Sequence, residues 1–229
     1  KVDRARCTAC GSCSAICRYS AIVQVEDQVL LYPELCHSCG GCWLVCPVEA
    51  VEPVERPIGE LQRGRAGAVR FVQGTLEVGQ ARSVPLIEAV KAALDDRGGS
   101  QVSERPLALL DAPPGTSCPV VETVRGCDYV VLVAEPTPFG LHDLKLAVEM
   151  VRTLRLPFGV VVNRASVAPG AMQDYCRGRG IPVLAEIPDD RSLAEAYARG
   201  EMIVEALPHY AEVFSRVVAR VVEQGEAVS

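Results

Sequence analysis

Lysine is scarce in this sequence of 229 residues, and positive charge is not in excess. The only lysines are Lys1, Lys91 and Lys145, and the formal net charge is −6. Because proteins that bind nucleic acids ordinarily present a basic patch, this balance argues against DNA or RNA as a partner. None of the three lysines follows a glycine, so the chain also lacks the G-x-x-x-x-G-K-[ST] loop that holds nucleotide phosphates.

The sequence also lacks an apolar run long enough to cross a membrane. Its longest apolar stretches, such as YVVLVA at residues 129–134, are far shorter than the roughly 18 residues that a membrane helix needs. The first residues, KVDRARCTAC, contain no apolar signal core. Hydrophobic residues still make up 49% of the chain, which is enough for one α/β domain and a small module. We therefore expect a cytoplasmic protein with no membrane span.

Cysteine, by contrast, is abundant and unevenly placed. Eight of the eleven cysteines lie in two runs with the spacing C-x2-C-x2-C-x3-C. This duplicated spacing, with Pro47 after the second run, is typical of bacterial ferredoxins that hold two 4Fe-4S clusters. The first run is Cys7, Cys10, Cys13 and Cys17, and the second is Cys36, Cys39, Cys42 and Cys46.

In this pattern the fourth cysteine of each run ligates the cluster held by the other run. We therefore assign Cys7, Cys10, Cys13 and Cys46 to a first cluster. The second cluster is assigned to Cys36, Cys39, Cys42 and Cys17. Gly11, Gly40 and Gly41 are expected to let the loops curl close to the clusters. Residues 21–32 are predicted to form a hairpin that turns near Glu26 and Asp27.

Zinc and disulfides are the alternative uses of these thiols. Zinc sites usually pair two C-x2-C hooks across a long gap, whereas three closely spaced thiols would crowd one tetrahedral ion. Disulfides are unusual in a reducing cytosol. The remaining cysteines, Cys118, Cys127 and Cys176, show no ligand spacing and are predicted to be small buried apolar residues.

Three other residues of the cysteine region have open roles. Arg18 stands after Cys17 where proline is usual, and it either points to solvent or raises the reduction potential of a nearby cluster. His37 and Trp43 lie within the second loop. We expect them to pack there, and the alternative is that they shield a cluster or tune its reduction potential.

The remainder of the chain alternates between predicted strands and helices. Residues 52–67 are predicted to be a linker or irregular segment, so we place an iron–sulfur domain of ferredoxin type (α+β) at 1–55 and an α/β domain at 56–229. Alternation with short connections predicts a doubly wound, mostly parallel sheet with helices on both faces. Strands are expected at 68–76, 106–111, 129–135, 158–164 and 181–188. Helices are expected at 83–96 (ended by Gly98 and Gly99), 118–126, 140–155, 170–180, 192–200 and 207–224.

Polar and turn residues follow several of these predicted strands. Ligands bind at the carboxyl ends of strands in such sheets, so these residues are candidates for a nucleotide site. Asp111 is the candidate to hold Mg2+ through water. The backbone amides of residues 113–117 are candidates to contact the terminal phosphate. Taken alone, each is more simply an ordinary loop or cap residue, but together, at successive strand ends, they favour a nucleotide site. The candidates are Asp111, Pro114, Gly115, Thr116, Asn163, Pro188 and Asp189.

Four long segments resemble the MinD/Mrp-like P-loop ATPases, and in particular a subfamily with an inserted two-cluster ferredoxin domain. They are GTLEVGQARSVPLIEAVK, LLDAPPGTSCPVVETVRGCDYVVLVAEPTPFGLHDLKLAVEMV, GVVVNRA and EIPDDRSLAEAYARGE. The resemblance implies that Asp111 belongs to the catalytic Mg2+ and switch region, and that Pro114, Gly115 and Thr116 lie beside the γ-phosphate. It also implies that Asn163 contacts adenine and that the loop at Pro188 and Asp189 closes on the base.

The family's glycine-rich loop with its lysines precedes the ferredoxin insert, and this chain lacks that part. We expect a P-loop NTPase-like but incomplete fold. This chain alone is not expected to hydrolyse ATP, and we expect it to be a truncation, a fragment or one half of a split pair. ATP or ADP with Mg2+ would bind only if the missing part is supplied. Expected partners are a redox protein and a second copy or split subunit. The functional alternatives are nucleotide-gated electron transfer, an iron–sulfur cluster carrier of Mrp-like type, and a ferredoxin with a degenerate structural α/β domain.

Overall fold

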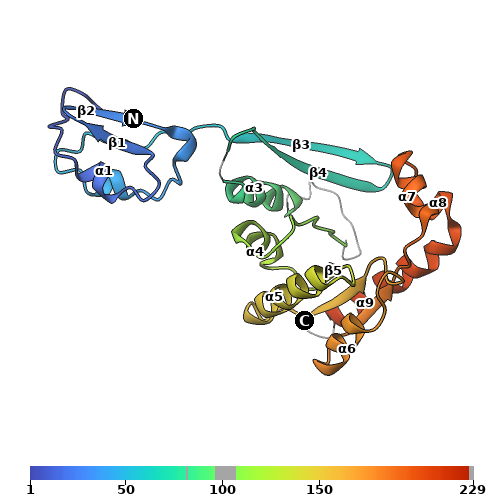
Figure 1. Cartoon of the computed structure of the whole chain (residues 1–229). Coiled ribbons are helices and arrows are strands. Elements are labelled where there is room, and N and C mark those ends of the chain that lie inside the picture. The colour runs from blue at the N-terminus through green and yellow to red at the C-terminus, as the bar shows by residue number, and fades with distance from the viewer. Residues whose placement is uncertain (81, 96–106, 227–229) are drawn as a thin grey trace. The chain divides into compact units, whose positions relative to one another are not determined.

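The computed structural model describes residues 1–80, 82–95 and 107–226 (Figure 1). The chain divides into two compact units, Lys1–Leu109 and Leu110–Ser229. Within the described residues, no helix is both long and apolar enough to traverse a bilayer.

The cysteine-rich segment folds as two short helices and a small antiparallel hairpin. Helix α1 (Ser12–Ile16), strands β1 (Ile22–Val25) and β2 (Gln28–Leu31), the 3-10 turn η1 (Pro33–Leu35) and helix α2 (Gly41–Leu44) follow one another. The predicted hairpin is confirmed, and it turns at Glu26 and Asp27, between the paired residues Val25 and Gln28.

The backbone of this segment repeats itself with an offset of 29 residues, as its cysteines do. Ile22 pairs with Leu31 in the hairpin, and their counterparts Val51 and Val2 form an isolated antiparallel bridge. Both pairings therefore join the end of one half to the start of the other, and both are formed by apolar residues.

A second hairpin follows, where the sequence predicts a linker. Strand β3 (Gly59–Ala66) pairs along its whole length with β4 (Val69–Leu76), and helix α3 (Val84–Asp95) packs on β4. A Cβ on Gly74 would lie 2.8 Å from Cγ of Leu86, so glycine permits that close packing. The prediction of an irregular segment at 52–67 is wrong for β3, because the pairing partner compensates for the low strand propensity of its glycines. The predicted helix end at Gly98 and Gly99 lies outside the described residues.

The second unit is built on three parallel strands in the order β5-β6-β7, which confirms the predicted mixed α/β character and parallel pairing. The elements are α4 (Cys118–Val124), β5 (Val130–Ala134), α5 (Pro138–Thr153), β6 (Phe158–Val162), α6 (Ala171–Gly178), β7 (Val183–Glu186), α7 (Arg191–Ala198), α8 (Ile203–Ala206), η2 (Pro208–Tyr210) and α9 (Ala211–Glu226).

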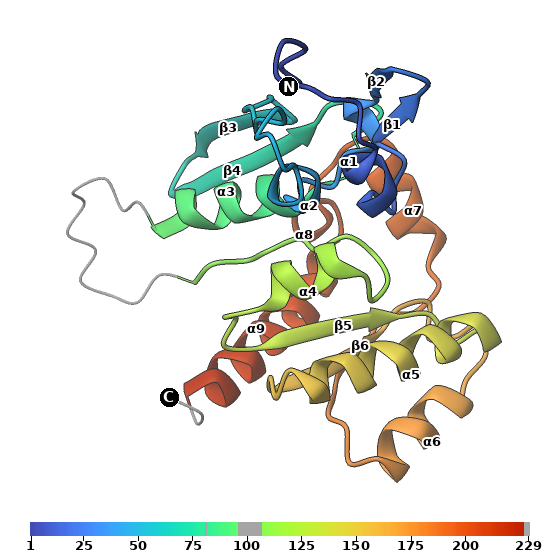
Figure 2. The same ribbon diagram turned by 90° about the vertical axis from the view of Figure 1, so that its left-hand side faces the viewer.

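The core of this unit lies between β6 and the helices that follow the strands. Val160 and Val162 of β6 are fully buried against Val148 of α5 and Met172 of α6. Figure 2 shows α5 and α6 along the same side of β5 and β6. An apolar strand buried in this way is what the valine-rich sequence of a central parallel strand predicts.

The predicted buried strand at 106–111 does not appear in the structure. Residues 107–111 form no strand, residue 106 lies outside the described residues, and Leu107 and Leu109 are 66% and 92% exposed. A strand needs a neighbour to accept its backbone hydrogen bonds, and within the described residues β5 pairs only with β6. Val133 on β5 is 65% exposed and, like Val131, lies on a face of that strand which the described residues do not cover.

Two matched truncations test where this core lies. We expect Val160→Ala to lower the free energy of unfolding by about 2–3 kcal/mol, because it removes buried apolar area and leaves a cavity. Val133→Ala in the adjacent strand should cost less than about 1 kcal/mol, since that side chain is 65% exposed. Urea unfolding followed by far-UV circular dichroism measures both, and equal losses would contradict the assigned core.

Candidate functional site

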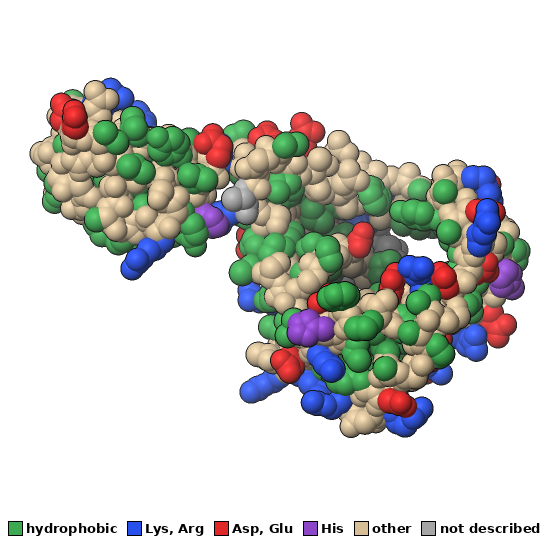
Figure 3. Space-filling model, viewed as in Figure 1, with side chains coloured by type: hydrophobic (Ala, Val, Ile, Leu, Met, Phe, Trp, Pro, Cys, Tyr) green, Lys and Arg blue, Asp and Glu red, His purple; other side chains and the backbone are tan. Residues whose placement is uncertain are grey.

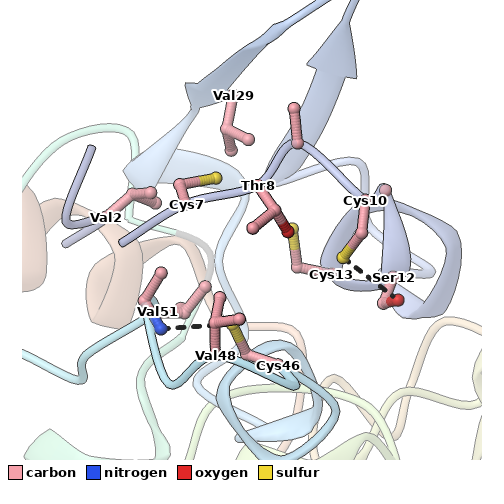
Figure 4. A pocket seen from close by; sticks show the side chains of 13 residues that line it. Val2, Cys7, Thr8, Cys10, Ser12, Cys13, Val29, Cys46, Val48 and Val51 are labelled. Atoms are coloured by element: carbon pink, nitrogen blue, oxygen red, sulfur yellow. Dashed lines mark hydrogen bonds between the residues drawn. The ribbon is translucent and has the colours of Figure 1, made fainter. Parts of the chain in front are cut away.

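One pocket gathers cysteines from both runs. Cys7, Cys10 and Cys13 reach it from the first loop and Cys46 from the end of the second run, as Figure 4 shows. Its other side chains are mostly apolar and include Val29 and Val48. The four thiols assigned to the first cluster are thus brought together around a single pocket.

Hydrogen bonds and burial set the protonation of these thiols. The hydroxyl and backbone of Ser12 lower the pKa of Cys10. Burial acts to raise the pKa of Cys46, but the backbone amides of Ala50, Val48 and Val51 outweigh it and the pKa is lowered. The Ala50 N–H donates to Sγ of Cys46 at 3.2 Å. Backbone donors aimed at sulfur favour the thiolate, which is the form that ligates metal.

The second group of cysteines lies on the matching loop. Burial raises the pKa of Cys42, and the neighbouring thiols of Cys36 and Cys39 add to the effect. The N–H of Ser38 donates to Sγ of Cys36 at 3.4 Å. Cys36 and Cys39 are exposed, whereas Cys42 is half-buried.

Cys17 is held next to this second loop by the residues around it. A Cβ on Gly41 would lie 3.6 Å from Cδ1 of Ile16 and 3.8 Å from Sγ of Cys39. Beyond Cys17, the ring of Tyr19 stacks on His37, which follows Cys36. Burial acts to raise the pKa of Cys17, but backbone amides led by that of Ile22 lower it, as happens at Cys46.

Left-handed backbone residues shape both loops in the same way. A positive φ exposes consecutive amides on one side of the chain, which is how short loops present donors to an anion. The side-chain amide of Gln24 adds a brace, since it donates to the carbonyl oxygens of Ala9 and Glu26 at 2.5 and 2.8 Å. Sequence reasoning missed Gln24, because its contact depends on the hairpin. The positive-φ pairs are Ala9 and Ser38, Gly11 and Gly40, and Ser20 and Glu49.

The chemistry of these donors fits an iron–sulfur cluster. All eleven cysteines are free thiols, and thiolates with amide donors at their sulfurs are the usual ligands of such clusters. In the described part of the chain, no three His, Cys, Asp or Glu residues group closely enough to hold one metal ion.

The three remaining cysteines divide between core and surface. Cys176 is fully buried and burial raises its pKa, which confirms the prediction for that residue. Cys127 is half-buried and its thiol donates to the carbonyl oxygen of Thr123 at 3.5 Å. The prediction is wrong for Cys118, which is exposed because it opens α4 next to an exposed loop.

The candidate nucleotide residues after β6 and β7 lie at one end of the sheet. Asn163 follows β6 and continues the ladder by donating its N–H to the Ala134 carbonyl oxygen at 2.9 Å. The N–H of Asp189 donates to Oγ of Ser166 at 2.9 Å, and its carboxylate pairs with Arg164 at 2.8 Å. The loop at Pro188 and Asp189 is thereby tied to the end of β6.

Arg164 is the residue that links these strand ends. Its Nε lies 2.8 Å from Oδ1 of Asp189 and its Nη1 lies 3.6 Å from Oε2 of Glu135. The hydrogen bond that Arg164 donates to the Asp189 carboxylate is the main cause that raises the pKa of Arg164. Its backbone has φ 54°, which arginine adopts only under constraint. The sequence indicates only that Arg164 follows a strand.

The other candidates occupy an exposed segment before α4. Asp111, Pro114, Gly115 and Thr116 are all exposed, and Gly115 has φ 93°. Among the hydrogen bonds and ion pairs of the described residues, none joins this segment to Asn163 or Asp189. The structure therefore brings together the candidates after β6 and β7, and no described hydrogen bond or ion pair links Asp111 to them.

Two comparisons relate the chain to known proteins. Residues 29–52 match the family model described as a 4Fe-4S binding domain. The chain is 35% identical over 158 residues to Uncharacterized protein MJ0578 of Methanocaldococcus jannaschii, and 25% identical over 190 residues to Uncharacterized protein MJ0579 of the same organism. The alignments cover 69% and 83% of this chain but 53% and 64% of those relatives.

A further relative is the Iron-sulfur cluster carrier protein of Aquifex aeolicus. It is 30% identical over an alignment of 135 positions, which covers 50% of this chain and 37% of that protein. The chain therefore covers less than two thirds of each of these relatives. Together the matches show an iron–sulfur binding protein that is distantly homologous to iron-sulfur cluster carrier proteins.

A glycine substitution tests the loop geometry. We expect Gly11→Ala to lower the iron bound after reconstitution, because its φ is 80° and the new Cβ would lie 2.6 Å from Oε1 of Gln24. Gly180→Ala is the matched control, with φ 62° and no atom within 4 Å of the new Cβ. Iron assays should show normal loading for the control, and normal loading of Gly11→Ala would refute the proposed geometry.

Proposed function

We propose that this chain is an electron-transfer protein that holds two 4Fe-4S clusters and exchanges electrons with a redox partner protein. The first cluster would be held by Cys7, Cys10, Cys13 and Cys46. The second would be held by Cys36, Cys39, Cys42 and Cys17. The observation that carries the proposal is the pocket in which Cys46 of the second run faces three cysteines of the first.

The protein's own part is to hold the thiolates and to set their surroundings. When bound, each cluster supplies a site that gains and loses one electron. Backbone amides that donate to Cys46 and Cys17 offset negative charge at sulfur, and such hydrogen bonds are among the factors that set reduction potential. Apolar side chains such as Val29 and Val48 line the first pocket.

The exposed apolar surface near the second loop supports docking of a partner. Trp43 and Leu44 of α2 are 45% and 70% exposed, and Leu35 is 48% exposed. Figure 3 shows hydrophobic side chains over much of the surface of this segment. Apolar patches of this kind commonly mark protein–protein contacts.

Removal of one ligand tests the two-cluster proposal. We expect about eight irons per wild-type chain, and about four after Cys46→Ser, because one cluster loses a thiolate. Reduced wild-type protein should show the electron paramagnetic resonance signal of two interacting clusters, and the variant that of one isolated cluster. Cys118→Ser, which replaces an exposed thiol outside both runs, should keep all the iron. A wild-type chain with about four irons would contradict the proposal.

The nucleotide part of the proposal concerns the second unit. It would be the incomplete part of a doubly wound MinD-like ATPase domain (56–229, after an iron–sulfur domain at 1–55), in which nucleotide gates electron transfer. Within the described residues one edge of β5 is unpaired, which suits a further strand from a second copy or a split subunit, and a split subunit would also supply the phosphate-binding lysine. Asn163, Pro188 and Asp189 would then contact the base of ATP or ADP, with Asp111, Pro114, Gly115 and Thr116 near Mg2+ and the phosphates. The eleven free thiols suit a cytoplasmic location.

A cluster carrier is the second candidate, and homology to proteins named iron-sulfur cluster carrier proteins favours it. The two functions differ in how firmly the clusters are held. Four thiolates at each site should retain their cluster, so we expect the loaded chain to pass less than about a tenth of its iron to an apo-ferredoxin while it is reduced and reoxidised repeatedly. Transfer followed by absorbance and by iron content of the acceptor measures this. Stoichiometric transfer within minutes would establish the carrier instead.

A further inference from the structure

The 29-residue repeat of the cysteine segment allows the surroundings of its two cluster sites to be compared position by position. Cys7 corresponds to Cys36 and Cys17 to Cys46. The same amide positions lower the pKa of the last cysteine of each run, and the same loop positions have positive φ. The backbone is therefore equivalent at these positions, and the side chains around it can be compared between the two sites.

One such difference concerns the residues that flank the ligands. Thr8 and Val48 line the first pocket, where Thr8 follows Cys7 and Val48 lies two residues after Cys46. Their counterparts at the second site are His37 and Tyr19. A small polar and a small apolar side chain are thus replaced by two rings.

These two rings are in direct contact. The ring centroids of Tyr19 and His37 are 3.7 Å apart and the ring planes meet at 13°, which is a stacked arrangement. Tyr19 lies in the segment that carries Cys17, two residues after it. His37 lies in the loop that carries Cys36 and follows that cysteine directly. The stack therefore joins the two chain segments that must stay together for the second site to keep four ligands.

Exposure shows why the second site needs such a contact. Cys36 and Cys39 are exposed, as is Tyr19 with 48% of its surface accessible, while His37 is half-buried. At the first site the N-terminal residues help to hold the halves, because Val2 bridges to Val51 and the Asp3 N–H donates to the Ala50 carbonyl oxygen at 2.7 Å. At the second site the hairpin pairing of Ile22 and Leu31 takes the place of the Val2–Val51 bridge, and the Tyr19–His37 stack is an additional contact.

We propose that the Tyr19–His37 stack is a clasp that holds the Cys17 segment against the Cys36 loop and so retains the second cluster specifically. The inference rests on the proposed two-cluster function. Tyr19 and His37 are positioning residues in it: they act through the cysteines next to them and ligate nothing. A contact between aromatic rings of this kind is sufficient to change the rate of cluster loss about two- to tenfold.

The test replaces each ring with its counterpart from the first site. His37→Thr and Tyr19→Val remove the stack, Tyr19→Phe keeps it, and Thr8→Ala and Val48→Ala are the matched controls at the first site. Iron release from the loaded full-length chain to a chelator is followed at fixed pH, together with the electron paramagnetic resonance spectrum of the reduced protein. Cys17→Ser identifies the release phase that belongs to the second cluster, because that phase disappears from its trace.

We expect His37→Thr and Tyr19→Val to accelerate only the second-cluster phase, by about two- to tenfold, while Tyr19→Phe releases iron like the wild type. The controls should leave that phase unchanged. Equal acceleration of both phases would show a general effect on folding and overturn the clasp. A wild-type iron content near eight, together with an unchanged second-cluster phase in His37→Thr and Tyr19→Val, would overturn the clasp and leave the two-cluster proposal standing. A wild-type iron content near four, in one phase insensitive to His37→Thr, would overturn both.

Discussion

The cysteine segment depends on backbone amides that point at sulfur. Thiolates repel one another, and a site that collects four of them needs donors to offset their charge. Left-handed residues such as Gly11 and Gly40 turn the chain so that its amides face the cysteines. The amides that follow Cys17 and Cys46 do the same for the last cysteine of each run. Side chains are secondary to this arrangement, which explains how two runs with different intervening residues adopt one conformation.

The second unit depends on a different constraint, which is how completely each parallel strand is enclosed. Strand β6 pairs with β5 and β7, its residues 159–162 are buried, and Val160 and Val162 are fully enclosed. Among the described residues β5 pairs with β6 alone, and it buries Val130 while Val133 remains largely exposed. The order of the sheet thus decides which of several similar valine-rich segments is buried most completely. The ends of the strands then bring Asn163, Arg164 and Asp189 to one edge.

The two halves of the cysteine segment show how a repeated backbone can serve two distinct sites. Equivalent main-chain geometry fixes where the thiols lie, and the side chains between them are free to differ. Thr8 and Val48 line the pocket at the first site, whereas His37 and Tyr19 stack on one another at the second. The iron–sulfur character of the chain follows from the shared main-chain geometry. Any difference in behaviour between its two sites follows from the side chains that differ.

The sequence by itself determined the features that are encoded locally. Cysteine spacing indicated the iron–sulfur segment, and the alternation around Glu26 and Asp27 predicted the hairpin. Valine-rich runs separated by amphipathic segments predicted the parallel strands β5 to β7.

Tertiary structure alone decided what depends on distant partners. Strand β3 forms because β4 accepts its hydrogen bonds, and residues 107–111 stay irregular where no strand among the described residues pairs with them. The Tyr19–His37 stack and the Arg164–Asp189 pair are likewise contacts between residues 18 and 25 positions apart, which local patterns do not specify. The physical reason is common to all of these: a hydrogen bond or a packed surface has two sides, and a local pattern describes only one of them.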